Sequence, residues 1–555
     1  MSGKQSRQIF QIGPYERALE NRVQTWRDQD FIRRFWDKNP TLWFPKKESE
    51  IEDRMGWLHL PEMMQKKIDD LTRFAETVRL EDRAHVVLLG MGGSSLAPEV
   101  FQKTFGNAPG YPELTVLDTT HPDAVRSLEE RVDISKALFL VSSKSGTTLE
   151  TLSLFRYFWK RMDESGIRPG QNFVAITDPD SPLDKVARDR EFRDVFRAPT
   201  DVGGRYSAFT VFGLIPAALI GVDVRHLLEK GHAAAEKNAS HADPGDASGF
   251  LLGAVLGEMA KERDKLTILT SPALESFPDW LEQLIAESTG KCGKGLIPVV
   301  NEPRVSVKEY GRDRVFVGLF EQGENNRELD GFLEKLEDME HPVIRIRLDD
   351  AYDLGQEIFL WEIGVASAGA ILGIHPFNQP DVQLAKELAK QAMSERSTGD
   401  IKDKQREGIE VTDWAKLEKE LKSWISQAQK GVYLGIQAYL APNPSTTEAL
   451  QSIRHALLRK TRLATTLGYG PRFLHSTGQL HKGGPNSGLF LQLVDEPEQD
   501  IAVPETDYTF GALIRAQARG DLEALRQRDR RVIRVNLNQD VQSSLHLVEK
   551  ILLDF

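Results

Sequence analysis

The feature that most constrains this chain is a polar turn at residues 142–148, Ser-Ser-Lys-Ser-Gly-Thr-Thr, which carries five hydroxyl side chains. The apolar run before it, residues 137–141, is typical of a buried parallel strand. Apolar residues at helical spacing follow it, at Leu152, Phe155 and Phe158. A strand that enters a helix in this way leaves unpaired backbone N–H groups, whose partial positive charge binds anions. Because a helix cap needs only one hydroxyl, the segment predicts a phosphate site.

A second glycine-rich turn lies upstream at residues 90–98, Gly-Met-Gly-Gly-Ser-Ser-Leu-Ala-Pro. It follows a predicted strand at residues 85–89 and leads into a helix, and its glycines let the backbone approach a ligand closely. The spacing lacks the third glycine of the dinucleotide fingerprint. Asp118 ends the next predicted strand, so a nicotinamide site stays an alternative, but the hydroxyl-rich turn favours a sugar phosphate.

Charge and cysteine content limit what the 555-residue chain binds and where it works. The formal net charge of −12 disfavours nonspecific binding to nucleic acid and to anionic membranes. A phosphorylated sugar is still a compatible ligand, because distant charges are screened over about 10 Å. The single cysteine, Cys292, excludes an intrachain disulfide and is compatible with a reducing cytosol.

No segment of the sequence predicts membrane insertion, secretion or a metal centre. No apolar run reaches the roughly 20 residues of a membrane helix. The N-terminal residues lack the apolar core of a signal peptide, and no Cys/His cluster has zinc spacing. We therefore predict a cytoplasmic protein without a structural metal.

Strand and helix patterns divide the chain into four segments. Residues 1–82 are predicted to be mostly helical. Residues 83–235 alternate apolar strands with helices, which is typical of a parallel sheet covered on both faces, and residues 236–400 repeat this alternation. Residues 401–555 predict a C-terminal α/β extension. The expected fold class is α/β, with two doubly wound parallel-sheet domains between the helical segment and the extension.

Five motifs resemble, in the same order, segments of the phosphoglucose isomerase family, which is built from two sugar-isomerase domains. They are the two turns above, Gly-Gly-Arg-Tyr-Ser at 203–207, Glu-Ser-Thr-Gly-Lys at 287–291, and Pro-Phe-Asn-Gln at 376–379 with the lysine that follows. The flanks, Thr-Leu-Trp at 41–43 and residues 468–475, are most similar to the isomerase half of bacterial transaldolase/phosphoglucose isomerase fusions.

The resemblance implies an aldose–ketose isomerase that interconverts glucose 6-phosphate and fructose 6-phosphate without a cofactor or a metal. Glu287 matches the family's proton-transfer base, and the apolar pair before it favours a raised carboxyl pKa. Arg205 matches the arginine that stabilises the enediolate with forked donors. Lys386 matches the ring-opening lysine. The alternative is that Lys386 is an exposed lysine on an amphipathic helix, because Lys390 lies one turn further on.

The resemblance also implies which residues hold the substrate. Phosphate-binding positions are expected in the two turns, at Ser94, Ser143, Lys144, Ser145, Thr147 and Thr148. Other residues expected to line the same site are Gly93, Gln283 and Gln379. The expected partner is a small-molecule sugar phosphate, with no nucleic acid and no membrane.

One departure from the family pattern concerns a histidine. Family members carry one downstream of the Glu-Ser-x-Gly-Lys segment, where it opens the sugar ring across a dimer interface. This chain has no histidine between Glu287 and His341. The segment 475–485 carries two histidines, a lysine and three glycines, so we hypothesise that it supplies the imidazole within the same chain. Of the two, we expect His481 rather than His475, because a lysine and two glycines follow it. Homodimer and monomer both stay open.

Other functions are also open at this stage. A noncatalytic phosphosugar-binding module would need the two turns but not Glu287, Arg205 and Lys386 together, so their joint presence favours the enzyme. A nicotinamide dehydrogenase would be detected by binding of NADH. An additional activity on mannose 6-phosphate depends on the shape of the pocket, which the sequence does not show.

Overall fold

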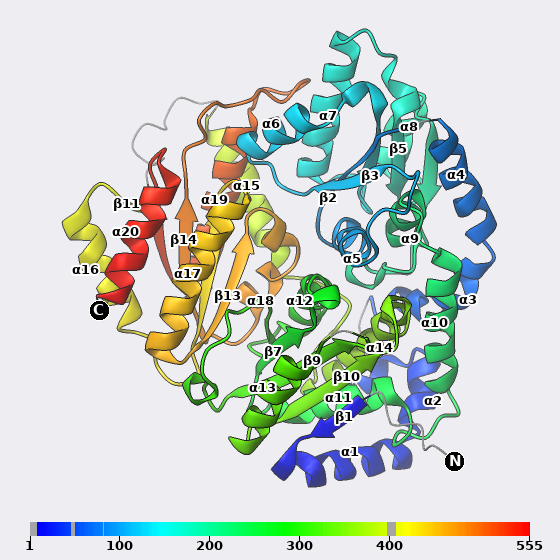
Figure 1. Cartoon of the computed structure of the whole chain (residues 1–555), viewed down its shortest axis with the longest axis vertical. Helices are drawn as coiled ribbons and strands as arrows, with labels where there is room; N and C mark the ends of the chain where they lie inside the picture. Colours follow the sequence, from blue (N-terminus) through cyan, green and yellow to red (C-terminus); the bar gives the residue numbers. More distant parts are fainter. Residues whose placement is uncertain (1–7, 46–49, 82, 324, 397–406, 555) are drawn as a thin grey trace.

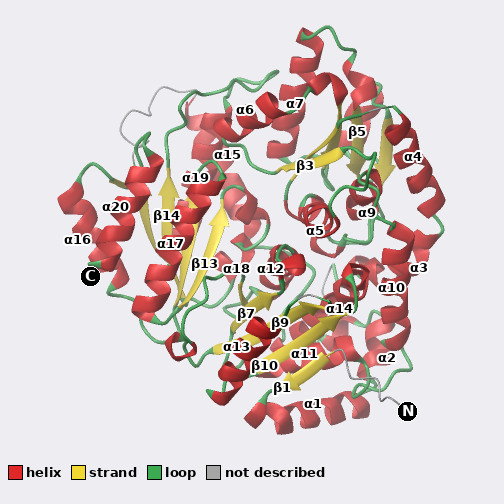
Figure 2. Ribbon diagram, viewed as in Figure 1, coloured by secondary structure: helices red, strands yellow, loops and turns green. Residues whose placement is uncertain are grey.

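A computed structural model describes residues 8–45, 50–81, 83–323, 325–396 and 407–554 of the protein. These residues form three five-stranded sheets, and helices flank each of them (Figures 1 and 2). The arrangement confirms the predicted α/β fold class.

The first sheet is entirely parallel, with the strand order β3-β2-β4-β5-β6. Alternate residues of β2 belong to different hydrophobic cores: Val86 and Leu88 to one, Val87 and Leu89 to the other. Both faces are therefore buried, as expected of a doubly wound sheet. The strands are β2 (His85–Gly90), β3 (Glu113–Leu117), β4 (Ala137–Ser142), β5 (Phe173–Thr177) and β6 (Asp194–Arg197), and the helices are α5 (Leu96–Phe105), α6 (Pro122–Arg131), α7 (Leu149–Glu164), α8 (Pro182–Asp189) and α9 (Val211–Leu219).

The second sheet has the order β1-β10-β9-β7-β8 and is parallel except at one edge. The edge strand β1 (Gln8–Gln11) comes from the N-terminal segment, which the sequence predicts as mostly helical, and pairs antiparallel with β10. The other strands are β7 (Lys265–Thr270), β8 (Ile297–Val299), β9 (Arg314–Glu321) and β10 (Val343–Leu348), and the main helices are α10 (Val224–Lys237), α11 (Ser248–Met259), α12 (Phe277–Thr289), α13 (Arg327–Asp338) and α14 (Leu354–Leu372).

The helices of the N-terminal segment are α1 (Glu16–Asp28), α2 (Phe31–Trp36), α3 (Leu60–Gln65) and α4 (Ile68–Leu80). Their apolar side chains join the large core beneath the first two sheets, where Trp26 stacks on Phe31 with ring centroids 4.4 Å apart. The segment thus packs against both sheets instead of forming a separate layer.

The third sheet is parallel throughout, with the order β11-β15-β14-β12-β13. When the edge strands β1 and β11 are set aside, the second strand in chain order lies at one edge of each sheet beside the first, followed by the third and the fourth. The predicted α/β extension therefore repeats the strand order of the two sheets before it. Its strands are β11 (Ile409–Glu410), β12 (Tyr433–Tyr439), β13 (Ala464–Tyr469), β14 (Gly488–Val494) and β15 (Arg531–Asn536), and its helices include α16 (Trp414–Ile425), α17 (Pro444–Thr461), α18 (Gly478–Gly483), α19 (Phe510–Gln527) and α20 (Val541–Leu553).

We call the third sheet with its helices, residues 407–554, the third unit, and the first sheet with its helices the first unit. Helix α15 (Val382–Arg396) joins the third unit to the rest of the protein, because it packs along α19 (Figure 1). The two helices approach closely at Gly520, where an added Cβ would lie 2.6 Å from the backbone nitrogen of Ala389. Within the described residues, no helix combines the length and the apolar composition needed to cross a membrane.

Glu362, in the middle of α14, is 1% exposed, and neither of its carboxyl oxygens has a hydrogen-bond partner among the described residues. Burial raises the pKa of this carboxyl well above its ordinary value of 4.5. The unfolded chain ionises Glu362 above that value and the folded chain does not. The free energy of unfolding therefore falls as the pH rises, by about 1.4 kcal/mol per unit until the folded pKa is reached. We expect Glu362→Gln to raise the Tm at pH 8.5 and to change it less at pH 5.5.

Thermal unfolding at the two pH values checks this expectation. The matched control is Glu62→Gln, because the side chain of Glu62 is 64% exposed. A Tm shift for Glu362→Gln that is the same at both pH values would show that the buried carboxyl does not titrate differently on folding.

Candidate active site

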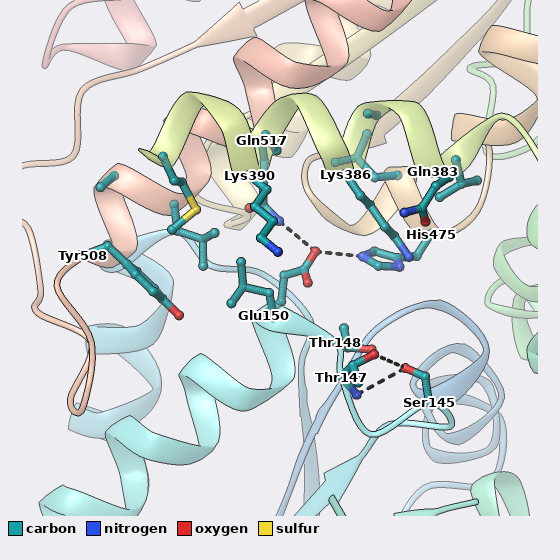
Figure 3. Close-up of a pocket in the computed structure, with 18 of the residues that line it drawn as sticks. Ser145, Thr147, Thr148, Glu150, Gln383, Lys386, Lys390, His475, Tyr508 and Gln517 are labelled. Carbon is teal, nitrogen blue, oxygen red and sulfur yellow. Dashed lines mark hydrogen bonds and ion pairs between the residues drawn. The ribbon is translucent and has the colours of Figure 1, made fainter. Parts of the chain in front are cut away.

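The hydroxyl-rich turn connects β4 to α7 and opens onto a cavity of about 910 Å³ (Figure 3). Ser145, Thr147 and Thr148 line the cavity, and the Ser145 and Thr147 hydroxyls lie 2.9 Å apart. Gly146 has a φ of +66°, a left-handed conformation that glycine adopts without strain. The 16-residue helix α7 begins directly after Thr148, so its positive N-terminal end faces the same space. A turn of this geometry can bind an anion.

Not every expected phosphate residue lies on this cavity. Ser143 is buried and donates to the Thr148 hydroxyl at 3.0 Å. Lys144 forms an ion pair with Asp178, N to O 2.5 Å, and Ser94 is buried within the glycine turn. None of the three is among the residues that line the cavity. Ser143 supports the turn from behind, and Lys144 ties it to the end of the next strand.

The upstream glycine turn holds two other segments at close range. Gly92 has a φ of +55°, and an added Cβ there would lie 2.6 Å from the carbonyl oxygen of His475. A Cβ on Gly93 would lie 2.1 Å from the carbonyl oxygen of Gly204. The glycines are therefore needed for backbone packing, and they bring the segments that carry His475 and Arg205 together.

A buried ion pair joins Arg205 to Glu287, with 2.7 Å between Nη1 and Oε1. Arg205 is 3% exposed, and it also donates from Nη2 to the carbonyl oxygen of Asn378 at 2.8 Å and from Nη1 to Gln379 Oε1 at 3.3 Å. Gln283 lies one turn before Glu287 on α12 and donates from Nε2 to Glu287 Oε2 at 3.0 Å. The structure thus brings together four residues that the sequence assigns to the site.

Two polar groups in this cluster are left without a hydrogen-bond partner among the described residues. They are Nε of Arg205 and Oε1 of Gln283, both buried. Buried donors and acceptors are normally paired, because an unpaired group costs about 1–3 kcal/mol. The Arg205 Nε donor and the Gln283 Oε1 acceptor can therefore each form a hydrogen bond to a polar ligand.

His475 comes from the third unit and contacts the first. Its Nε2 donates to Glu150 Oε1 at 2.8 Å, and the same oxygen accepts from Gln517 Nε2 at 2.7 Å (Figure 3). Burial alone would raise the pKa of Glu150, but the charge and hydrogen bond of His475 outweigh it, and the pKa falls to about 2. The carbonyl oxygen of His475 accepts from Gln283 Nε2 at 2.8 Å. His475 therefore lies between the hydroxyl-rich turn and Glu287.

His481 lies elsewhere, contrary to our preference for it over His475. It is 5% exposed and lies against the rings of Phe473 and Phe490, and its Nδ1 is 3.2 Å from Gln437 Nε2. Burial lowers its pKa well below the ordinary range. His481 is not among the residues that line the cavity, whereas His475 is. The loop composition that suggested His481 reflects packing inside the third unit.

Lys386 projects from α15 into the cavity beside His475, with Gln383 and Lys390 on the same helix (Figure 3). No hydrogen bond or ion pair joins Lys386 to another residue within the described part of the chain, so its ammonium is available to a ligand. Glu150 and Gln517 also line the cavity, and the sequence assigned neither. One sequence feature indicates Glu150 as a site residue, namely its position in the first turn of the helix that follows the hydroxyl-rich turn. No sequence feature indicates Gln517.

The sequence pattern of the family described as Phosphoglucose isomerase matches residues 67–301. The glucose-6-phosphate isomerase of Enterococcus faecalis is 27% identical over 388 residues, 60% of this chain and 86% of that protein. The glucose-6-phosphate isomerase of Rubrobacter xylanophilus is 28% identical over 388 residues, 61% of this chain and 89% of that protein.

Two crystal structures share the fold. That of a glucose-6-phosphate isomerase from Chlamydia trachomatis has a TM-score of 0.58 at 18% identity, and the match covers 69% of this chain and 87% of that chain. That of a hypothetical protein from Thermus thermophilus has a TM-score of 0.60 at 22% identity and covers 70% of this chain and all of that chain. These two structures show a shared fold, and the matched pattern and the curated relatives show that the chain is similar to the phosphoglucose isomerase family over most of its first two sheets.

Proposed function

We propose that the protein is a glucose-6-phosphate isomerase, which interconverts D-glucose 6-phosphate and D-fructose 6-phosphate. The observation that carries the proposal is the buried ion pair of Arg205 and Glu287, which places a carboxylate base beside forked donors. His475 connects this pair to the hydroxyl-rich turn, through Gln283 on one side and Glu150 on the other. The names of the curated relatives agree with this chemistry.

Ring opening is the first step, and we assign it to His475 with Lys386. Because Glu150 accepts from Nε2, the Nδ1 of His475 is the nitrogen that exchanges a proton with the sugar. The ionised Glu150 stabilises the imidazolium that forms, much as a carboxylate orients the histidine of a hydrolase triad. Lys386 donates hydrogen bonds to the sugar oxygens as their protons move.

Proton transfer between C2 and C1 then falls to Glu287. Its carboxylate removes the C2 proton of the open aldose and returns it to C1, so one group serves both halves of the reaction. The developing enediolate oxygens need donors that are already in place, and Arg205 supplies them from a buried position. The unpaired Arg205 Nε and Gln283 Oε1 give the substrate further hydrogen-bonding positions.

The substrate phosphate is assigned to Ser145, Thr147 and Thr148 at the N-terminus of α7. Replacing two of these hydroxyls, with Ser145→Ala and Thr147→Val together, is expected to raise the KM for fructose 6-phosphate about 30-fold, because a hydrogen bond to a charged group contributes about 1.5–3 kcal/mol. The kcat should change by less than about threefold, since the phosphate does not react. Inorganic phosphate should lose potency as a competitive inhibitor by a similar factor.

The control for this variant is Ser165→Ala, which removes an exposed hydroxyl at the other end of α7. It should leave both constants unchanged. If the double variant kept the wild-type KM and the wild-type inhibition by phosphate, the phosphate would have to bind elsewhere.

The proposed activity is tested by a coupled assay in which glucose 6-phosphate formed from fructose 6-phosphate is oxidised by its dehydrogenase, with a chelator present. Turnover supports the isomerase. Binding of fructose 6-phosphate in a calorimeter without turnover would favour a noncatalytic phosphosugar-binding module instead.

We also propose that one chain holds a complete site, because His475 reaches Glu150 within the same chain. A monomer is then sufficient for activity. All four predicted segments would then act together in one chain, and the last of them would provide His475 for ring opening. The segments are 1–82, 83–235, 236–400 and 401–555.

A further inference from the structure

Arg472 opens the short turn η12 (Arg472–His475), and His475 closes it. The guanidinium reaches from this turn to the first sheet. Its Nη1 lies 3.0 Å from Asp118 Oδ2, directly after β3, and its Nη2 donates to Glu99 Oε2 on α5. Two carboxylates of one unit thus hold a turn that belongs to another.

The side chains of Arg472, Glu99 and Asp118 are largely shielded from water. The exposed fractions of their side chains are 24% for Arg472, 17% for Glu99 and 12% for Asp118. Burial would raise the pKa of Glu99, but Arg472 and then Lys103 outweigh it and lower the pKa to about 2, so Glu99 stays charged at neutral pH. Shielded ion pairs are screened less by salt and constrain geometry more than exposed ones.

Three contacts hold the other end of the turn. The carbonyl oxygen of His475 rests over Gly92 and accepts one hydrogen bond from Gln283, and the ring makes one contact to Glu150. These contacts position the imidazole only while the turn lies against the first unit. A neutral side chain at residue 472 would leave Glu99 and Asp118 without their common partner, and the turn could then move away.

We propose that Arg472 is a positioning residue for the proposed ring opening, which holds residues 472–475 against Glu99 and Asp118 so that His475 stays in contact with Glu150. The inference rests on the proposed function for its kinetic consequences. Arg472 touches no reacting atom, and it acts only on the step that uses His475. A displacement of about 1 Å at a reacting group can lower a rate about 100-fold.

The kinetic test uses a substrate that needs no ring opening. In 5-O-methyl-fructose 6-phosphate neither ring can close, because O5 is methylated and O6 carries the phosphate. Proton exchange at C1 in D2O, followed by NMR, is measured for this compound and for fructose 6-phosphate. We expect Arg472→Gln to slow exchange of fructose 6-phosphate about 30-fold and that of the open-chain compound by less than about twofold. Equal slowing of both compounds would overturn the proposal.

A double-variant comparison shows whether Arg472 acts through the histidine. On a His475→Ala background, Arg472→Gln should slow exchange of fructose 6-phosphate by less than about twofold more, since both changes affect one group. If the double variant were slowed by the product of the two single-variant factors, the result would contradict the proposal. The matched control is Arg190→Gln, which removes another ion pair between the first and third units, Arg190 Nη2 to Glu505 Oε2 at 2.7 Å, and should leave both rates unchanged.

A measurement without substrate separates this inference from the proposed function. Hydrogen–deuterium exchange of peptides covering residues 472–484 should accelerate in Arg472→Gln and not in Arg190→Gln. Unchanged exchange would overturn the positioning role even if the wild-type protein proved inactive on sugar phosphates. Asp118→Asn removes one carboxylate of the same contact and serves if Arg472→Gln does not fold. It should also accelerate exchange of these peptides, and wild-type exchange in Asp118→Asn would count against the proposal. Arg472→Lys, which keeps the charge, should restore most of the protection.

Discussion

Replacing Glu287 by glutamine is expected to lower kcat for fructose 6-phosphate about a thousandfold or more, while KM changes by less than about threefold. The amide cannot accept the C2 proton, yet it has nearly the same shape. Its oxygen can still accept from Arg205, so the buried guanidinium keeps a partner at the position where Glu287 now lies 2.7 Å away. The loss should therefore appear in turnover and not in folding or binding. Steady-state kinetics in both directions check it.

Two controls make the result specific. Glu275→Gln changes an exposed carboxylate just before α12 and should keep wild-type kinetics. Calorimetric titration with fructose 6-phosphate should give similar affinities for Glu287→Gln and the wild-type protein. A Glu287→Gln protein that retained a tenth of the wild-type kcat would exclude Glu287 as the base, because a general base contributes about 100-fold to 10,000-fold.

Local sequence signals locate the hydroxyl-rich turn beside a cavity, and phosphate binding there stays a prediction. The turn after β4 was predicted from its hydroxyls and from the strand and helix around it, and the structure places it at the mouth of a cavity. The approach of Arg205 to Glu287 was expected from the family resemblance, not from any local pattern, since the two residues come from different units.

The sequence does not predict the direction in which individual side chains point. Lys144 has the charge that a phosphate requires, but it turns to Asp178 at the end of the neighbouring strand. Residue type alone does not reveal this choice, because a carboxylate 34 positions away competes with the expected ligand. The same holds for His481, whose neighbours Phe473 and Phe490 come from different elements of the third unit.

The third sheet shows which structural features the periodicity of apolar residues predicts and which it does not. Alternating strands and helices predicted an α/β extension but not its strand order, because order is set by which strands pair at long range. The structure shows that this order repeats that of the first two sheets. This unit brings His475 and Gln517 to Glu150, and these contacts depend on the long-range strand pairing that local periodicity does not predict.

His475→Ala is expected to lower kcat for fructose 6-phosphate about 100-fold and to change turnover of 5-O-methyl-fructose 6-phosphate by less than about twofold. The open-chain compound bypasses the step that needs an imidazole, whereas enolisation by Glu287 is common to both. Glu150→Gln should give a weaker version of the same pattern, because an amide no longer stabilises the imidazolium. Exchange at C1 in D2O reports on both compounds without a coupling enzyme.

His481→Ala is the matched comparison, and its effect should fall on stability instead of turnover. Removing the ring leaves a space between Phe473 and Phe490 and takes the partner from buried Gln437. Both changes are destabilising, together by about 2–4 kcal/mol, so the Tm should fall while kcat per folded molecule stays within about twofold. His475→Ala should lower kcat and leave the Tm nearly unchanged, because the ring of His475 lies at a cavity and its removal creates no space in a hydrophobic core. The two histidines are six residues apart, and this opposite pair of outcomes assigns one to chemistry and the other to packing. If His475→Ala kept wild-type turnover of the cyclic substrate, ring opening would have to use another group of the cavity, and Lys386 would be the first to test.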